Sequence, residues 1–159
     1  MSPFARHPRL FSIAVGLLAL LLAAIPLPHL LDLLRPDFLL LVMIWFALMT
    51  PRIGGLTYAW LAGLSLDAFR GLVLGENAFA FVVIAYLVHY FHLRIRMFPL
   101  TQQALVVMSL LWLYQFLLFW IDGITGHPIT GWARWLPALT GAALWLPLSG
   151  LLARYTHRS

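Results

Sequence analysis

The stretch GLSLDAFRGLVLG, residues 63–75, places an aspartate and an arginine inside an apolar run that glycines punctuate. Asp67 and Arg70 are three residues apart, so on a helix they share a face, and the sequence predicts that they pair. An unpaired charge among apolar groups is costly, and an ionisable residue inside a membrane is a candidate functional residue. Two interpretations stay open for this pair, a structural contact between helices and a functional site.

Small residues recur around Asp67 at helical spacing. Steps of four residues give Gly55, Ala59, Gly63, Gly71 and Gly75. Small residues allow helix backbones to approach closely in membranes, so this row indicates helix docking. The row drifts around the helix by about 40° per step, so its two ends cannot face one neighbour. The segment from Gly71 to Gly75 also fits a loop that ends the helix.

The composition of the whole chain indicates a membrane protein. Of 159 residues, 63% are hydrophobic and 9% are charged, and the mean hydropathy is +0.94. No polar segment is long enough for a separate soluble domain, so we predict one integral membrane domain over residues 1–159. The arginines are scattered singly, which argues against a nucleic-acid partner. The chain has no cysteine, which excludes disulfides and thiolate metal sites.

Six apolar runs approach the length of about 20 residues that a helix needs to cross a bilayer. They cover Leu10–Pro26, Pro36–Thr50, Ile53–Leu72, Ala78–Leu93, Leu100–Ile121 and Trp132–Ala153. We predict an all-α polytopic bundle of six transmembrane helices, in which the first run is a retained span and not a cleaved signal peptide. The second run is short, so five spans remain an alternative.

The distribution of charge predicts the orientation of these spans. Six spans with both termini in the cytoplasm give the inner side most of the arginines, as the positive-inside rule requires. These are Arg6, Arg9, Arg52, Arg94, Arg96, Arg154 and Arg158. The outer half then holds Arg35, Arg70 and Arg134 with every acidic residue, Asp32, Asp37, Asp67, Glu76 and Asp122.

The sequence offers no complete catalytic or metal-binding set. His89 and His92 share a helical face, but no carboxylate or cysteine lies near them, which favours interfacial anchoring over metal binding. Ser65 precedes Asp67 without a histidine at the same depth. We therefore predict a protein that is not an enzyme, with no catalytic residue, metal or cofactor. Arg35 and Asp37 flank Pro36, which we predict to occupy an early position of a helix at the outer interface.

The segment RPDFLLLVMIWFALMTPRIGGLTYAWLAGLSLDAFRGLVLGENAFAFVVIAYLV, residues 35–88, resembles the central region of the MreD family. This family comprises small integral membrane subunits of the bacterial rod-shape machinery, the elongasome. The motifs that carry the resemblance are RPD, TPR, Gly63 with Asp67, GLVLG, and QQAL at Gln102–Leu105. The resemblance extends over almost the whole chain.

The resemblance implies a non-enzymatic scaffold in the bacterial inner membrane. Its expected partner is MreC, a single-span protein, and through the wider complex it is expected to serve MreB filaments, the RodA glycosyltransferase and its transpeptidase. The implied fold is similar to the S-components of energy-coupling factor transporters, with six helices around an outward cavity. A small-molecule-binding transporter subunit is therefore the alternative function, and it would need several polar groups that converge in that cavity.

The candidate residues for partner docking or for intramembrane polar contacts follow from these patterns. They are Arg35, Asp37, Gly63, Asp67, Arg70, Gly71 and Gly75.

Overall fold

The computed structural model describes residues 7–128 and 131–156. Within these residues the chain forms seven α-helices and one 3-10 helix, and no β-strand. The elements are α1 (Pro8–Ala24), α2 (His29–Leu33), α3 (Phe38–Met49), α4 (Leu56–Arg70), α5 (Glu76–Met97), α6 (Leu100–Thr125), η2 (Trp132–Trp135) and α7 (Leu136–Thr156). The predicted all-α bundle is confirmed. Each of the six predicted runs overlaps one α-helix, the last run also includes η2, and α2 is the one α-helix of the described residues outside them.

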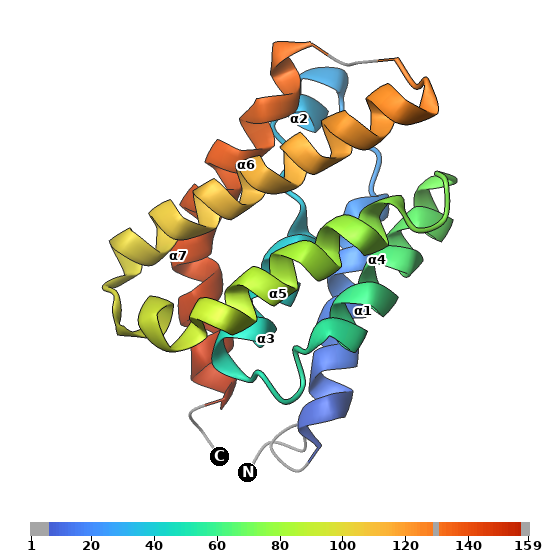
Figure 1. Cartoon of the computed structure of the whole chain (residues 1–159). Coiled ribbons are helices and arrows are strands. Elements are labelled where there is room, and N and C mark those ends of the chain that lie inside the picture. Colours follow the sequence, from blue (N-terminus) through green and yellow to red (C-terminus); the bar gives the residue numbers. More distant parts are fainter. Residues whose placement is uncertain (1–6, 129–130, 157–159) are drawn as a thin grey trace.

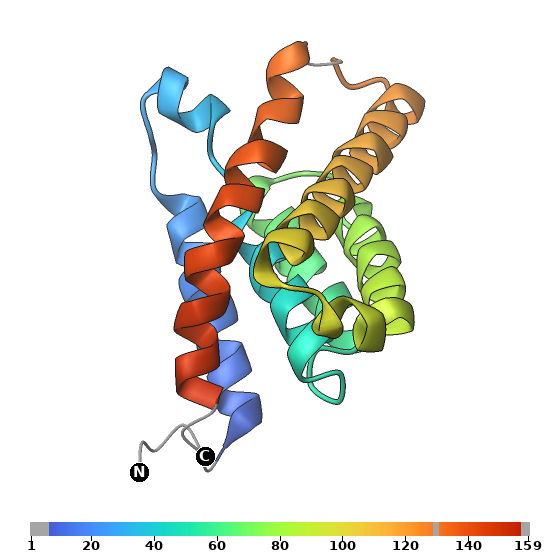
Figure 2. The ribbon, with the colours of Figure 1, turned by 90° about the vertical axis from the view of Figure 1, so that its left-hand side faces the viewer.

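Helix α3 forms the centre of the bundle. Every residue from Leu39 to Leu48 is buried, and α1, α4, α5 and α7 pack around the helix. Figure 2 shows α3 between α1 and α7 on one side and the α4–α5 pair on the other. Twelve helical residues extend only about 18 Å, less than the hydrocarbon thickness of a bilayer. A helix that is apolar on all sides is stable here because protein surrounds it.

The start of α3 differs from the sequence prediction. The helix begins at Phe38 with Asp37 as its N-cap residue, so Pro36 precedes the helix and does not occupy an early helical position. The backbone of Asp37 has ψ of 85°, which is outside the helical range, and the helix therefore cannot begin earlier. The side chain of Asp37 does not cap α3, which leaves it free for another contact.

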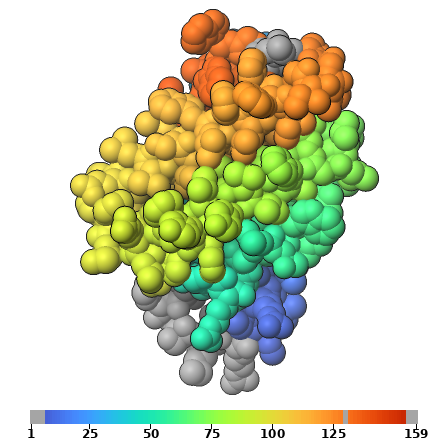
Figure 3. All heavy atoms as spheres, viewed as in Figure 1, coloured from blue at the N-terminus to red at the C-terminus, as the bar shows by residue number. Residues whose placement is uncertain are grey.

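Three segments are long and apolar enough to cross a membrane. They are Glu76–Met97, Leu100–Thr125 and Trp132–Arg154, and α1 is a shorter apolar helix. Figure 3 shows α5 and α6 covering a broad face of the molecule. Many exposed side chains of these two helices are apolar or aromatic, among them Phe79, Tyr86, Leu105, Trp112 and Phe116. The protein is a multi-pass membrane protein whose apolar surface suits contact with lipid.

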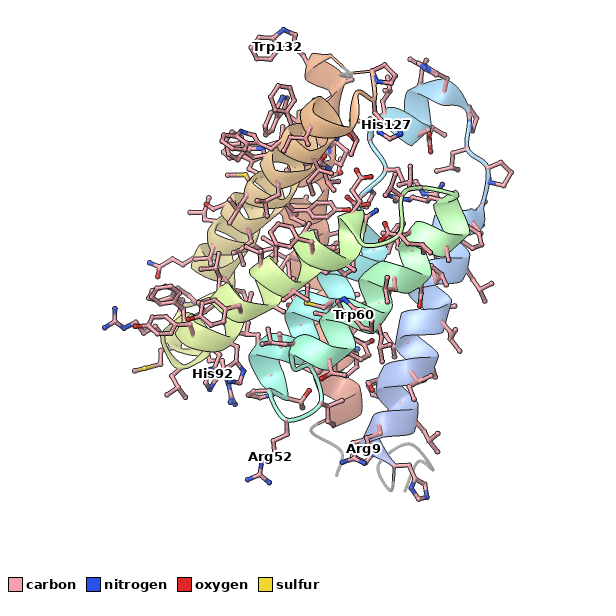
Figure 4. All side chains as sticks on the ribbon, turned by 45° about the vertical axis from the view of Figure 1, so that its right-hand side comes forward. Arg9, Arg52, Trp60, His92, His127 and Trp132 are labelled. Carbon is pink, nitrogen blue, oxygen red and sulfur yellow. The ribbon has the colours of Figure 1, made fainter. Side chains whose placement is uncertain are left out.

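The two ends of the bundle carry different residues. Arg9, Arg52 and His92 lie at one end in Figure 4, and His127 and Trp132 lie at the opposite end. The last turn of α5 adds Arg94 and Arg96 to the first of these ends. The predicted Arg6 and Arg158 lie outside the described residues. The side of the membrane that each end faces stays a prediction.

Helices α4 and α5 form a hairpin with extensive contacts (Figure 1). Gly63 is buried in this contact, and a Cβ atom added to it would lie 2.3 Å from the Cα atom of Ala78. The two backbones approach so closely that only glycine fits at residue 63. The contact that Gly63 makes in the described residues is therefore internal to the chain.

We expect Gly63→Ala to lower the stability of the bundle by about 1–3 kcal/mol, because the added methyl group must push α4 and α5 apart. Thermal unfolding of the purified protein in detergent measures the effect. Gly150→Ala on α7 is the matched control, because an added Cβ atom there has no neighbour within 4 Å. Equal melting temperatures for the two variants would contradict the close approach at Gly63.

Candidate functional site

The carboxylate of Asp67 lies fully buried between the end of α4 and the start of α5. Its Oδ1 atom accepts hydrogen bonds from the backbone N–H (3.0 Å) and the side-chain amide (2.7 Å) of Asn77. Its Oδ2 atom accepts from the backbone N–H of Gly75 at 2.9 Å and, more weakly, from that of Ala78 at 3.4 Å. The first N–H groups of a helix have no partner within the helix, and they carry partial positive charge. Asp67 therefore caps α5 from another helix.

The turn between α4 and α5 brings these donors to Asp67. Gly71 ends α4 with φ of 65°, and Gly75 precedes α5 with φ of 106°. Residues with a Cβ atom rarely adopt this left-handed backbone conformation, so both positions favour glycine. The open alternative that Gly71 and Gly75 belong to a loop is confirmed. Neither has a neighbour within 4 Å of an added Cβ atom, so conformation and not packing favours glycine there.

Arg70 does not pair with Asp67, and this prediction is wrong. The Arg70 guanidinium instead donates to Oδ1 of Asp37 at 3.0 Å, 33 residues away in the sequence. The reason is that the start of α5 supplies Asp67 with four donors. Arg70 at the end of α4 is then available for Asp37, whose side chain does not cap α3. The pair fixes the end of α4 to the start of α3.

Further polar contacts extend this framework to the other helices. The Tyr114 hydroxyl on α6 donates to the side-chain oxygen of Asn77 and so connects α6 with α5. Arg35 donates to the carbonyls of Leu22 and Ile25 at the end of α1, where carbonyls lack helical partners. Arg35 also pairs with Asp32 at 3.5 Å. The predicted polar residues thus act as connections between helix ends.

These contacts surround a polar cavity of about 560 Å³ at the end of the bundle that carries the acidic residues. The cavity brings together Arg35, Asp37 and Arg70 from the predicted set, whereas Gly63 lies in the α4–α5 contact. The charged residues that line it are Asp32, Arg35, Asp37, Arg70, Glu76, Asp122 and Arg134, and Asn77, Tyr114 and Gln115 add polar groups.

The candidate set from the sequence omitted four residues that contribute to the cavity. Arg134 of η2 pairs with Asp122 near the end of α6, and both side chains are largely buried. Tyr114 and Gln115 lie in the long apolar run of α6 and are also buried. A glutamine and a tyrosine side by side in a membrane helix were the available signal, because polar groups at that depth need a partner.

We expect Asp67→Asn to lower the unfolding free energy by about 1–3 kcal/mol, because one oxygen becomes an amide that faces backbone donors. Thermal unfolding in detergent measures this loss. Asp32→Asn removes the same charge at an exposed position of the cavity rim and should change stability by less than about 0.5 kcal/mol. An unchanged melting temperature for Asp67→Asn would contradict the capping role.

Double-mutant cycles distinguish the two possible partners of Arg70. We expect a coupling of about 0.5–1 kcal/mol between Asp37→Asn and Arg70→Gln, since the pair is partly exposed. The cycle of Asp67→Asn with Arg70→Gln should give a coupling near zero. A coupling between Asp67→Asn and Arg70→Gln, with none between Asp37→Asn and Arg70→Gln, would instead support the Asp67–Arg70 pair expected from the sequence.

Comparisons with known proteins agree with the resemblance seen in the sequence. No solved structure matches the chain, so the expected likeness to S-components stays a prediction. The chain is 27% identical to the Rod shape-determining protein MreD of Haemophilus influenzae over 141 residues, which cover 89% of this chain and 86% of that protein. Residues 6–155 match the family described as rod shape-determining protein MreD. The chain therefore belongs to the MreD family of rod shape-determining proteins.

Proposed function

We propose that this protein is a non-enzymatic scaffold of the rod-shape machinery in the bacterial inner membrane, and that it holds the transmembrane helix of an MreC-like single-span partner. Its role in rod shape follows from family membership. The scaffold proposal is supported by the buried polar groups, which bond to one another between helices. Asp67, Asn77 and Tyr114 hold helices together and leave no spare nucleophile and base among them.

The observation that carries the docking proposal is a groove between α1 and α4. It encloses about 180 Å³, and its lining includes the small residues Gly16, Ala62 and Ser65 among apolar side chains. Small residues on a membrane-facing groove allow a second helix to approach closely. A polar or water-soluble occupant does not suit this groove, because its other lining residues are Ile13, Leu17, Leu20, Leu39, Tyr58 and Leu61.

Tyr58 gives this groove a fixed shape. Its hydroxyl donates to the carbonyl of Ser12 at 2.9 Å and so connects α4 to α1. A Cβ atom at Gly16 would lie 2.8 Å from the Tyr58 hydroxyl oxygen, so glycine leaves room for the contact. The groove is therefore held open by a contact within the chain, and a partner helix would meet a preformed surface.

The charge distribution supports an orientation for the scaffold. Arg9 and Arg52 lie at one end of the bundle (Figure 4), and the last turns of α5 and α7, which end there, carry Arg94, Arg96 and Arg154. The positive-inside rule assigns that end to the cytoplasm, which puts both termini there as well. In this orientation the arginine-rich end faces MreB filaments, and the polar cavity faces the side where RodA and its transpeptidase build the wall. In our proposal the protein interacts with MreB, RodA and the transpeptidase only indirectly, through the wider complex.

The alternative, a small-molecule-binding transporter subunit, gains support from the polar cavity, which holds more converging groups than the sequence indicated. Ligand binding and partner docking are compatible here, because the cavity and the groove share no lining residue. A role in transport alone would leave cell shape unaffected when the gene is deleted. Membership in a rod shape-determining family supports the scaffold as the main function.

We expect Ser65→Leu to reduce co-purification of the MreC-like partner at least tenfold and to produce round cells, because a leucine fills the groove. Ser109→Leu on α6 is the matched control. Both serines are exposed and bond the carbonyl four residues earlier, but Ser109 lies outside the groove. Equal amounts of the two variants in the membrane establish that insertion is unaffected. Normal co-purification and cell shape with Ser65→Leu would exclude this groove as the docking site.

A further inference from the structure

Two buried groups of opposite charge in the polar cavity lack a hydrogen-bond partner among the described residues. They are Oε2 of Glu76, a residue with only 7% of its surface exposed, and Nη1 of Arg134. The other charged residues of the cavity form the pairs Asp32–Arg35, Asp37–Arg70 and Asp122–Arg134. Glu76 is thus the one cavity carboxylate outside these pairs, and Arg134 keeps a spare donor.

The two residues with unsatisfied groups line the same cavity and share Asp122 as a neighbour. Arg134 donates to Asp122, and Glu76 interacts with the same Asp122 carboxyl group and, less strongly, with Asp67. Asp122 therefore lies near both the carboxyl group of Glu76 and the guanidinium group of Arg134. Buried polar groups in proteins are almost always hydrogen-bonded, and leaving a charged group unpaired is costly. A group from outside the chain that satisfies both would need a hydrogen-bond donor for Oε2 of Glu76 and an acceptor for Nη1 of Arg134.

The arrangement limits the chemistry of that group. A metal cation would meet Glu76 and Asp122 but also the positive charge of Arg134, and no group of three possible metal ligands occurs in the described part of the chain. An anion alone would meet Arg134 but be repelled by Glu76 and Asp122. A group that carries both a cationic donor and an anionic oxygen matches both sides at once.

We propose that the cavity binds a small zwitterionic group, a primary ammonium joined by a short chain to an anionic oxygen group. The ammonium donates to Oε2 of Glu76, and the anionic oxygen accepts from Nη1 of Arg134. Gln115, a buried cavity residue with an amide that can donate and accept, lies in the same lining. The headgroup of phosphatidylethanolamine and a free amino acid or phosphoethanolamine share this chemistry.

The proposal is independent of partner docking, because none of these residues lines the α1–α4 groove. A failure of Ser65→Leu to affect the partner would leave it unchanged. Conversely, an empty cavity would leave the docking proposal unchanged.

The test uses the full-length protein in nanodiscs that contain equal amounts of phosphatidylethanolamine, phosphatidylcholine and phosphatidylglycerol with identical acyl chains. Native mass spectrometry then measures which lipid the protein retains. Phosphatidylcholine keeps the charges but cannot donate a hydrogen bond from its ammonium, and phosphatidylglycerol lacks the ammonium. In parallel, the melting temperature in detergent is measured with millimolar O-phosphoethanolamine or glycine.

Glu76→Gln is the test variant, because it keeps the shape of the side chain and removes the negative charge. Asp32→Asn is the matched control, since it removes a carboxylate at the exposed rim of the same cavity. The comparison of headgroups on the unmodified protein keeps the proposal testable even where a variant does not fold.

If the ligand is a lipid, we expect a preference of about tenfold or more for phosphatidylethanolamine, which is the effect of one charge-assisted hydrogen bond. Glu76→Gln should lose this preference, and Asp32→Asn should keep it. For a soluble source we expect no lipid preference, but a rise in melting temperature with a free zwitterion that Glu76→Gln abolishes. Equal retention of all three lipids together with no shift by either free zwitterion would overturn the proposal and leave water as the partner of both groups.

Discussion

The capping of α5 by the carboxylate of Asp67 is the interaction on which the rest of the structure depends. The carboxylate belongs to α4, and it satisfies backbone donors of the turn and of the first residues of α5. It thereby fixes the hairpin in which Gly63 meets the backbone at Ala78. Asn77, held by Asp67, in turn receives the Tyr114 hydroxyl of α6. One buried charge thus determines how three helices meet, and an apolar side chain could not replace it.

The remaining charged contacts at this end act in the same manner, each fixing one helix end. Asp37 and Arg70 connect α3 with α4, and Asp122 and Arg134 connect α6 with η2. In a membrane such contacts stabilise the fold, because helix ends expose backbone N–H and C=O groups that lipid cannot hydrogen-bond. The contacts also leave a cavity in their midst that is lined by charged and polar groups together with apolar side chains. The framework that stabilises the bundle therefore also creates the site that can receive a ligand.

The sequence allowed the helices to be predicted much better than their partners. Hydropathy located six of the helices, and the isolated charge in an apolar run identified Asp67 as a residue with either a structural or a functional role, because both signals are local. The partner of Arg70 could not be predicted, since Asp37 is 33 residues away and i,i+3 spacing suggested a closer one. The contribution of Arg134 and Asp122 depends in the same way on how α6 and η2 fold back. The close approach at Gly63 was indicated by small residues, but not that the neighbour is α5 of the same chain.

Hydrogen exchange at the start of α5 tests the role of Asp67 most directly. Amide exchange of residues 71–78 can be followed by nuclear magnetic resonance on the protein in detergent micelles. If the carboxylate caps α5, the amides of Gly75 and Asn77 exchange as slowly as those inside the helix. In Asp67→Asn one carboxylate oxygen becomes an NH₂ group, so at least one of these two amides exchanges as rapidly as those of the turn residues Val73 and Leu74. Rapid exchange of Gly75 and Asn77 in the unmodified protein, or no change in Asp67→Asn, would contradict this role.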